Sequence, residues 1–447
     1  MIMQATISAN QIQIAKDNHF QAMHQVHACY AAKQKAWQYF SELGLPTPKT
    51  EQYKYTPITN KLADAFDLSQ PIATSQLTKE AITACLDPMP DAYQLVLLNG
   101  QLSSTYSNLG HAKLLFEVLT FTEAFQQQHP LFIQHFAQYE PAQAEVFAAL
   151  NTVLFEEGIF IHIADQAILD KPLFIYHITD SSYTQGLAYP RILIQAGKNS
   201  QASLVASWHA IGAYPSFTNA VTEICLNQDA QLTYYHLQTK DLDQAYQVHA
   251  THCYQASKSI LNHYSFTLDG LFVRNNLQVH SNASHSETNM YGIYCLDKQQ
   301  HVDNHTIVDH KQPNTQSSEL YRGILAGQAS GVFNGKIYVR AQAQQTNAFQ
   351  ANNNLLVSDQ ATIHTKPQLE IWADDVKCSH GATTGQLDEA QLFYLQARGI
   401  PTNMARYMLL NAFASEVIQQ VPLLSLKQYL QTALTAKLTS FHTIEKP

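Results

Sequence analysis

The stretch Gly331-Val332-Phe333-Asn334-Gly335-Lys336-Ile337-Tyr338-Val339 is a short β-type run, and it is typical of more than half of the chain. Similar runs recur from about residue 158 to residue 393, separated by polar corners that contain glycine or asparagine. The clearest of them cover residues 159–163, 192–194, 203–206, 232–237, 260–268, 277–280, 306–308, 355–357 and 369–372. Runs this short and this numerous indicate a β-sandwich, a β-barrel or a β-solenoid.

The length of this β-rich stretch favours the solenoid. It runs for more than 200 residues with no helical pattern between the strands. Residues 352–354 are all asparagine and resemble the stacked polar corners of a parallel β-helix, and we interpret Gly335 as a tight corner between two coils. No strict sequence repeat accompanies the pattern. A double sandwich is therefore the alternative on pattern alone.

Helical patterns precede the β-rich stretch. Residues 10–43 carry apolar side chains at helical spacing, and Gly44 is expected to end that helical segment. Residues 95–98 indicate a strand followed by a turn, and residues 118–154 indicate further helix. The N-terminal part is thus expected to mix helices with at least one strand.

Helical spacing returns at the C-terminal end, over residues 405–418 and 424–438. We expect the apolar face of these helices to pack on the β-rich part, and prefer that interpretation to a partner-binding face. The sequence therefore predicts three domains, which are a mixed helical N-terminal domain at 1–157, a β-helix core at 158–395 and a C-terminal helical domain at 396–447.

Composition argues against several classes of protein. The 447 residues carry a formal net charge of -9 and form no basic stripe, which argues against binding to nucleic acid. No run of about 18 apolar residues is present, and the polar N-terminus lacks the features of a signal peptide. The six cysteines are scattered without any CxxC pair, so free thiols are expected. We expect a soluble cytoplasmic protein that does not bind membranes.

Cys378 and His380 are the candidate metal ligands. They are separated by one residue, so on an extended segment both side chains project to the same face and could bind one soft or borderline metal ion. Zinc and iron-sulfur clusters usually take four protein ligands. The pair alone therefore implies ligands from elsewhere or a site shared across a subunit interface, unless it is merely a buried thiol beside a hydrogen-bonded histidine. We interpret the adjacent Asp374 and Asp375 as structural.

Other motifs give no catalytic centre. Residues 331–337 look like a phosphate loop, but three residues separate the two glycines where four are needed, and Ile337 replaces the hydroxyl residue that would hold magnesium. We interpret His249, His252 and Cys253 as structural, and His310 as a hydrogen-bonding residue at a corner. No hydrolase, metalloprotease, EF-hand or dinucleotide fingerprint is present. A binding or scaffolding role is favoured over catalysis.

The stretch Ala373-Asp374-Asp375-Val376-Lys377-Cys378-Ser379-His380-Gly381-Ala382 is the most specific motif of the C-terminal half. The resemblance that it carries is to the core signature of the SufB and SufD family of iron-sulfur cluster assembly scaffolds. It also includes residues 321–323, 333–339, 350, 354–356, 367–371, 392–395 and 397–400, and upstream residues 44–47, 51, 53–56 and 309–310. Two features favour the D-type branch, namely the run His380-Gly381-Ala382, where B-type proteins typically carry glutamate after the histidine, and no cysteine between Gln350 and Leu356.

The resemblance implies a right-handed parallel β-helix flanked by an N-terminal α/β domain and a C-terminal helical domain. It implies a non-catalytic scaffold that pairs with SufB through the β-helix and docks the ABC-type ATPase SufC through its C-terminal helices. By the same resemblance, His380 and its neighbour Cys378 would bind iron or the nascent iron-sulfur cluster at the interface with SufB. It leaves open whether reduced flavin binds the complex, and whether the isolated chain forms a homodimer.

Two other classes are carried as alternatives. Parallel β-helices also occur in carbohydrate-active enzymes, which use carboxylates in a long groove but are usually secreted. A free-standing homodimeric binding protein is the third class, because a β-helix has an edge that could pair with a second copy of itself. Metal analysis, a polysaccharide activity screen and native mass spectrometry distinguish the three.

Overall fold

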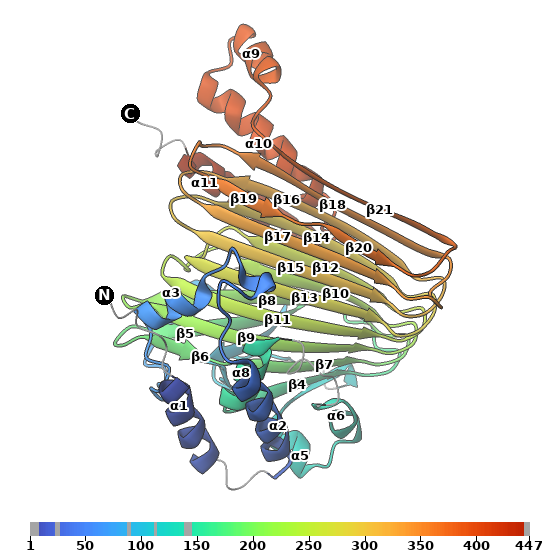
Figure 1. Cartoon of the computed structure of the whole chain (residues 1–447). Helices are drawn as coiled ribbons and strands as arrows, with labels where there is room; N and C mark the ends of the chain where they lie inside the picture. The colour runs from blue at the N-terminus through green and yellow to red at the C-terminus, as the bar shows by residue number, and fades with distance from the viewer. Residues whose placement is uncertain (1–8, 23–26, 87–90, 111–113, 138–144, 442–447) are drawn as a thin grey trace.

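A computed structural model describes residues 9–22, 27–86, 91–110, 114–137 and 145–441. Residues 158–385 form a β-solenoid, preceded by a region of helices and short strands and followed by three helices. Figure 1 shows the strands stacked like the rungs of a ladder, from α1 and α2 at one end to β21 and α9 at the other. The predicted fold class is confirmed.

The solenoid consists of two long sheets whose strands alternate along the chain. Sheet A contains ten strands in the order β2 (Gln101–Leu102), β1 (Tyr93–Leu98), β5 (Leu173–Ser181), β8 (Gln201–Gly212), β10 (Gln231–Gln238), β12 (Ile260–Thr267), β14 (Glu287–Leu296), β16 (Gln316–Leu325), β18 (Thr346–Leu356) and β21 (Val376–Gly385). Sheet B runs β19 (Thr362–Thr365), β17 (Ser330–Val339), β15 (His301–His310), β13 (Phe272–Ser281), β11 (Ala245–Gln255), β9 (Ser216–Leu226), β7 (Arg191–Ala196), β4 (Gly158–Ile163) and β3 (Phe116–Thr120), with β20 (Gln368–Ile371) on β17 and β6 (Gly186–Ala188) on β9.

Strands of successive coils pair in parallel and in register. One coil takes 26 to 33 residues, as the partners Tyr246 and Phe272 or Gly158 and Arg191 show. Each strand covers the unpaired backbone groups of the one before it, so the solenoid satisfies its own hydrogen bonds as it grows. Because the coil length varies, no strict sequence repeat is visible.

Side chains alternate between the interior of the solenoid and its outer faces, as β-geometry requires. Apolar residues such as Leu204, Leu232 and Val302 fill much of the interior. Two predictions of corners were wrong. Gly335 lies within β17, where an added Cβ would come 2.2 Å from the Gln350 amide nitrogen. The asparagines at 352–354 lie within β18, where Asn352 donates a 2.9 Å hydrogen bond to the buried hydroxyl of Tyr294.

Helices of the N-terminal region pack on the outer face of sheet B. They are α1 (Ala9–Ala22), α2 (His27–Leu43), α3 (Ile58–Ala65), α4 (Lys79–Cys85), α5 (Phe121–Gln126), α6 (Pro130–His135) and α8 (Val146–Leu154), with a 3-10 turn at Glu51–Tyr53. One apolar cluster joins α2 and α8 to outward side chains of sheet B such as Phe160 and Phe217. α4 is the exception, because Ile82 and Cys85 join a cluster on sheet A.

The N-terminal predictions were confirmed in part. The segment predicted helical at 10–43 contains two helices, and Gly44 follows α2 with a left-handed φ of 65°. The predicted strand at 95–98 is β1, followed by a tight turn to β2. The prediction of helix from residue 118 was wrong at its start, because Val118 pairs with Ile161 in an antiparallel strand. Residues 138–144 lie outside the described residues.

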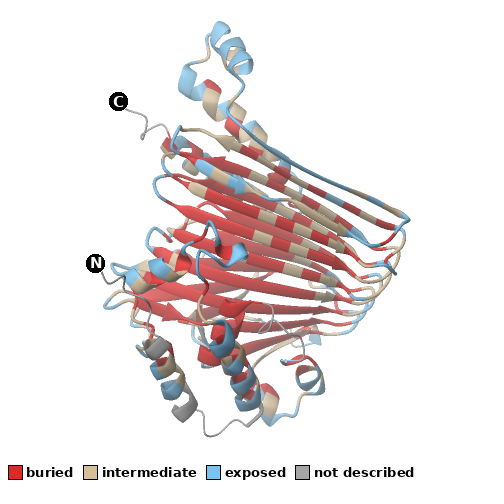
Figure 2. Ribbon diagram, in the orientation of Figure 1, coloured by how far each residue is buried: buried red, intermediate tan, exposed pale blue. Residues whose placement is uncertain are grey.

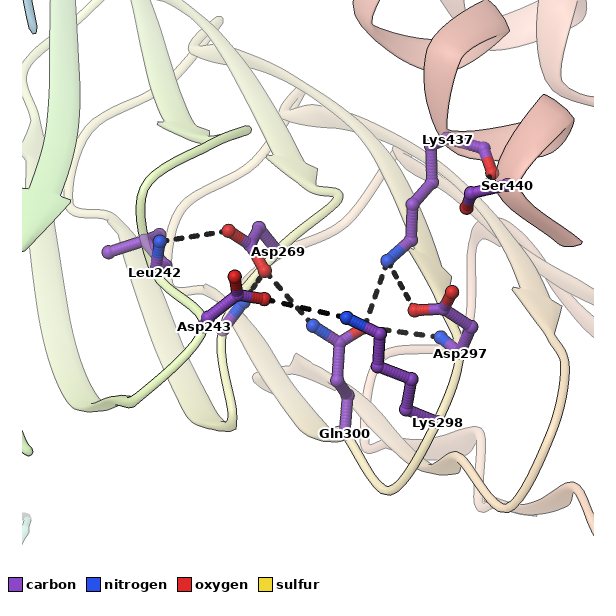
Figure 3. Close-up of polar contacts among 9 residues, drawn as sticks. Leu242, Asp243, Asp269, Asp297, Lys298, Gln300, Lys437 and Ser440 are labelled. Carbon is purple, nitrogen blue, oxygen red and sulfur yellow. Dashed lines mark hydrogen bonds and ion pairs between the residues drawn. The ribbon is translucent and has the colours of Figure 1, made fainter. Parts of the chain in front are cut away.

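The last three helices are α9 (Glu389–Ala397), α10 (Thr402–Ile418) and α11 (Leu424–Ser440). As predicted, the apolar faces of α10 and α11 pack on the β-rich part, on the outer face of sheet A, through Leu410, Ala414, Val417, Ile418, Leu426, Leu430, Leu434 and Leu438. Polar contacts also hold these helices on the solenoid. Figure 3 shows Lys437 of α11 reaching Asp297 and Gln300 in a turn between coils, at 2.7 and 2.9 Å.

A buried ion pair fixes the N-terminal segment to sheet B. The guanidinium of Arg274 on β13 contacts the carboxylate of Asp303 on β15, and both side chains are fully buried. Arg274 also donates a 2.8 Å hydrogen bond to the Gln52 carbonyl and lies 3.8 Å from the centre of the Tyr53 ring. Thr56 donates to the same carboxylate. The proline-rich connection after α2 is thus held by charges from two coils.

All six cysteines are free thiols, as predicted, and only Cys378 is partly exposed. Among the described residues, no helix is long and apolar enough to cross a membrane.

Candidate functional site

β21 carries both candidate ligands and forms the end of sheet A. It pairs with β18 on one side, and no strand of the described residues covers its other side. Seven of its last eight residues are exposed, Cys378 being the exception. Figure 2 shows this change from the buried strands of the middle coils to the exposed final rung and α9. A ten-residue edge strand with this exposure presents unpaired backbone donors and acceptors to a partner.

Cys378 and His380 lie on the same face of β21, as the one-residue spacing predicted. Cys378 is paired with Ala348 and packs at the rim of a small apolar cluster with Ile337 and Val339. His380 is paired with Gln350 and is exposed at the open end of the solenoid. The alternative of a buried thiol does not apply, because Cys378 is partly exposed and His380 is exposed.

The environment of Cys378 keeps its thiol protonated in the isolated chain. Burial raises the pKa of Cys378 above the ordinary value for cysteine, and a hydrogen bond from the Ala348 backbone opposes this only in part. A thiolate is the form that binds a soft metal ion, so binding of a metal ion to this thiol would have to displace its proton.

A row of side chains on successive strands of sheet A faces the interior of the solenoid and ends at His380. Register aligns Met290, Glu319, Gln350 and His380 on four successive strands of sheet A. The Gln350 amide donates a 2.7 Å hydrogen bond to the Glu319 carboxylate, and both side chains are buried. Gly335 on the facing sheet leaves the space that the Gln350 side chain fills. Sequence reasoning did not select Glu319 or Gln350, and their only signal is a spacing of one coil from His380 for Gln350 and of two coils for Glu319.

Glu319 is a buried carboxyl whose protonation changes near neutral pH. Burial raises the pKa of Glu319 to about 7, against the effect of the hydrogen bond from Gln350. The folded state therefore binds this proton more tightly than the unfolded chain, whose glutamate titrates near 4.5. The stability that Glu319 contributes is present in full below about pH 4.5 and is lost as the pH rises through about 7.

Replacing Glu319 by glutamine should therefore remove this pH dependence. We compare the free energy of unfolding of Glu319→Gln with that of the unchanged chain. The difference in favour of the variant should grow between pH 5 and pH 8 by up to about 3 kcal/mol, because one pKa unit corresponds to about 1.4 kcal/mol. The measurement is the thermal or urea unfolding midpoint of both chains across that range. Glu42→Gln on the surface of α2 is the control, and an equal difference at every pH for Glu319→Gln would contradict the assignment.

The other candidate residues from the sequence do not belong to the Cys378 and His380 pair. Asp374 and Asp375 are exposed in the turn before β21, and backbone groups of Asp375 bond to residues 344 and 345 of the preceding coil. His249 and Cys253 face the opposite side of β11 from His252. His310 contacts the hydroxyls of two neighbouring residues at 2.8 and 2.9 Å. Its predicted hydrogen-bonding role is confirmed, although it lies in a strand.

β21 thus brings two potential ligands together on one face. It offers one thiol and one imidazole, whereas an iron-sulfur cluster or zinc takes four ligands. Groupings of three or more potential ligand residues occur elsewhere in the described residues, but none includes Cys378 or His380.

Comparison with known proteins identifies the family. Residues 177–413 match the SUF system FeS cluster assembly, SufBD core domain, and residues 11–175 match the SufBD protein N-terminal region. The chain belongs to the SufBD family. The two matches adjoin near β5, and the core-domain match includes β21, α9 and the start of α10.

Two relatives in the SufBD family are similar to this chain over nearly their whole length. An iron-sulfur cluster assembly SufBD family protein of Synechocystis is 30% identical over 415 residues, which cover 91% of this chain and 90% of that protein. The iron-sulfur cluster assembly protein SufD of Escherichia coli is 28% identical over 432 residues, which cover 94% and 98%. The predicted family resemblance is confirmed, and the chain is a SufBD family protein of iron-sulfur cluster assembly.

Proposed function

We propose that this chain is the D-type subunit of a Suf complex, a non-catalytic scaffold on which an iron-sulfur cluster is assembled together with SufB and the ATPase SufC. The observation that carries the proposal is the half-complete ligand set at the edge of sheet A. The absence of a cysteine between Gln350 and Leu356 and the run His380-Gly381-Ala382 favour the D-type branch. Similarity to SufD of Escherichia coli over 94% of the chain supports it. We expect the complex to work in the cytoplasm.

SufB is proposed to pair with the edge of β21. Exposed apolar side chains surround this edge, and they are Phe349 on β18, Ile371 at the end of β20 and Trp372 after it. The Trp372 ring stacks on Tyr338 and lies beside the guanidinium of Arg340, so it is held rigidly at the surface. An exposed strand edge with fixed aromatic neighbours is typical of a surface that another subunit covers.

His380, with Cys378 beside it, is proposed to hold iron or the nascent cluster as cargo against ligands from SufB. The exposed imidazole can offer a nitrogen to iron without breaking a hydrogen bond to any described residue that stabilises the fold. Cys378 would follow once the cargo or a cation of SufB lowers the cost of losing the thiol proton. The division of ligands between two subunits explains why this chain alone carries too few.

SufC is proposed to dock on α9 and the first half of α10. α9 has no buried residue, and Figure 1 shows it projecting from the end of the solenoid. Its exposed apolar side chains include Phe393, at 70% exposure, and Tyr394, and they continue into Met404 and Met408 on α10. The second half of α10 and α11 are instead covered by sheet A. The docking surface is thus the part of the C-terminal helices that the fold leaves uncovered.

The connection between these two surfaces is short. β21 ends at Gly385 and α9 begins at Glu389, so only three residues separate the strand that carries His380 from the proposed SufC surface. A rotation of α9 driven by ATP binding to SufC would therefore act directly on the edge strand. Such a movement would switch the SufB interface between two arrangements and bring the Cys378 and His380 segment towards the partner's ligands.

Co-purification tests the proposal. We expect this chain, co-expressed with SufB and SufC, to elute as one complex that contains iron and acid-labile sulfide. Recovery of the chain only as a homodimer, with SufB and SufC bound to each other but not to it, would contradict the proposal. Native mass spectrometry of the same samples identifies each species.

A point variant tests the docking surface without unfolding the chain. Phe393→Asp should abolish co-purification with SufC because it puts a charge at the centre of the exposed apolar surface, while leaving pairing with SufB intact. Deletion of the helices is a poorer test, since it would uncover the apolar face of sheet A. Gln396→Asp, on the same exposed helix, is the control, and undiminished SufC binding by Phe393→Asp would place the docking surface elsewhere.

A further inference from the structure

Three potential metal ligands meet on the outer face of sheet A, far from β21. They are Cys85 at the end of α4, His209 on β8 and Asp241 in the turn after β10, and their ligand atoms lie within 4.8 Å of one another. In the order of sheet A, β8 lies six strands from β21, which at about 4.8 Å per strand is roughly 29 Å. The group is therefore separate from the Cys378 and His380 segment.

The histidine is oriented as a metal ligand requires. Its Nε2 lies 2.9 Å from the Ser207 hydroxyl, and its Nδ1 lies 3.3 Å from a carboxylate oxygen of Asp241. When Nε2 carries its proton and donates to Ser207, the Nδ1 lone pair faces a carboxylate, and a cation between the two relieves their repulsion. A metal-bound histidine generally donates its other ring nitrogen in this way, which fixes the ring.

The position of the Asp241 carboxylate is set by its backbone. The backbone of Asp241 is held in the left-handed region, with φ of 61°, while its carbonyl accepts a 2.9 Å hydrogen bond from the Ala210 amide. This contact fixes the turn between two coils, so the position of the carboxylate does not depend on a mobile loop.

Cys85 supplies the third ligand atom, and an adjoining cavity gives the site access to solvent. The sulfur of Cys85 donates a 3.5 Å hydrogen bond to the Ala81 carbonyl, and metal binding would release that thiol proton to solvent. Cys85 and Asp241 line a cavity of about 450 Å³ that also borders Ser181 and Tyr214. Bond lengths of about 2.0 to 2.3 Å place neighbouring ligands of zinc roughly 3.3 to 3.8 Å apart, so small side-chain movements suffice. The cavity would admit a water or an exogenous ligand to the fourth position.

A second grouping of potential ligand residues does not have this geometry. Glu117, His129 and His162 also lie close together, but Nδ1 of His129 accepts a hydrogen bond from the Phe132 amide. The proton of neutral His129 is then on Nε2, directed at the Glu117 carboxylate at 2.9 Å. No lone pair of His129 faces the centre of that group. It is a hydrogen-bonded cluster, whereas the group at Cys85 has ligand atoms of three chemical types facing one point.

We propose that Cys85, His209 and Asp241 bind one divalent transition-metal ion of borderline softness, of the class of Zn²⁺ or Fe²⁺, with its fourth position open to the cavity. A thiolate, an imidazole and a carboxylate are the ligand types that such ions share in open sites. The site does not depend on the proposed function of β21. It gives this chain a metal-binding capacity of its own, independent of any partner subunit.

Cobalt binding tests the proposal on the full chain. The background is the Cys378→Ala, His380→Ala double variant, so that the edge-strand residues contribute no signal. Titration of the chelator-treated protein with Co²⁺ should give a thiolate-to-cobalt charge-transfer band that saturates at one equivalent, and competition with Zn²⁺ and, without oxygen, Fe²⁺ gives their relative affinities. Asp241→Asn keeps the left-handed turn and Cys85→Ala keeps the apolar contacts, yet each should weaken binding roughly tenfold or more.

The controls are matched to each alternative. Cys295→Ala removes another buried thiol of the same apolar cluster, and Glu117→Gln alters the histidine cluster, so both should leave the cobalt band and affinity unchanged. Absence of a saturable band, or a band of unchanged intensity in Cys85→Ala, would overturn the proposal. Circular dichroism of each variant establishes that loss of binding is not loss of fold.

Discussion

Replacing His380 by alanine should lower the iron and sulfide content of the co-purified complex roughly tenfold or more, with the subunits still assembled. The expectation follows from the position of His380 at the exposed end of β21, where its side chain is not part of a buried cluster. Removing a ligand to the cargo costs at least as much as removing an outer partner of a ligand, which costs about 10–100-fold in metal affinity.

The matched control for His380 is Ser379→Ala. Ser379 is exposed on the same strand but faces the opposite side, so its loss should leave iron and sulfide content unchanged. Cys378→Ala separates the two candidates, and we expect a smaller loss because the thiol is partly buried and held protonated. Equal iron and sulfide in wild type and His380→Ala would remove the residue from the proposed site.

Asp303→Asn is expected to lower the free energy of unfolding by about 3 to 5 kcal/mol, because it leaves the fully buried Arg274 guanidinium without a counter-charge. Burial opposes ionisation of Asp303, yet Arg274 and His305 hold its pKa well below the ordinary value. The loss should also loosen the Glu51–Tyr53 turn, whose Gln52 carbonyl accepts from the same guanidinium. Urea unfolding followed by circular dichroism measures the effect.

Two further variants sharpen that test. Asp309→Asn breaks a bidentate pair with Arg340, whose side chain is 39% exposed, so water can replace the carboxylate and the cost should be within about 1 kcal/mol. Replacing both partners, as in Arg274→Met with Asp303→Leu, should recover much of the stability because no buried charge then lacks a partner. A loss as small for Asp303→Asn as for Asp309→Asn would contradict the assigned role of the pair.

The sequence predicted the solenoid from its apolar strands and missed the polar ones. The pattern 232–237 was found, whereas β16 was not, because Ser317 and Glu319 face the interior and break the apolar alternation that identifies a half-buried strand. His177 on β5, buried against Trp208 at a ring distance of 3.7 Å, has the same effect. A solenoid interior tolerates such residues because neighbouring coils supply stacking and hydrogen bonds, which single-strand patterns cannot reveal.

The candidate site was predictable only where its residues are neighbours in sequence. One intervening residue fixed the common face of Cys378 and His380, whereas the contact of Gln350 with Glu319 depends on a coil length that varies. The interpretation of Gly335 as a corner failed for the same reason, since the side chain for which it makes room comes from the next strand. The ligands at Cys85, His209 and Asp241 come from three separate elements and give no local signal at all.

The central claim is that SufB covers the edge of β21, and hydrogen exchange of the complex tests it most directly. Peptides that cover residues 376–385 should exchange quickly in the isolated chain, because one side of this strand is uncovered, and slowly once SufB is bound. Peptides of α9 serve as the internal comparison, since they should respond to SufC but not to SufB. Slowed exchange confined to residues 376–385 and their neighbours is the predicted result, and unchanged exchange there in a SufB-bound chain would contradict the account.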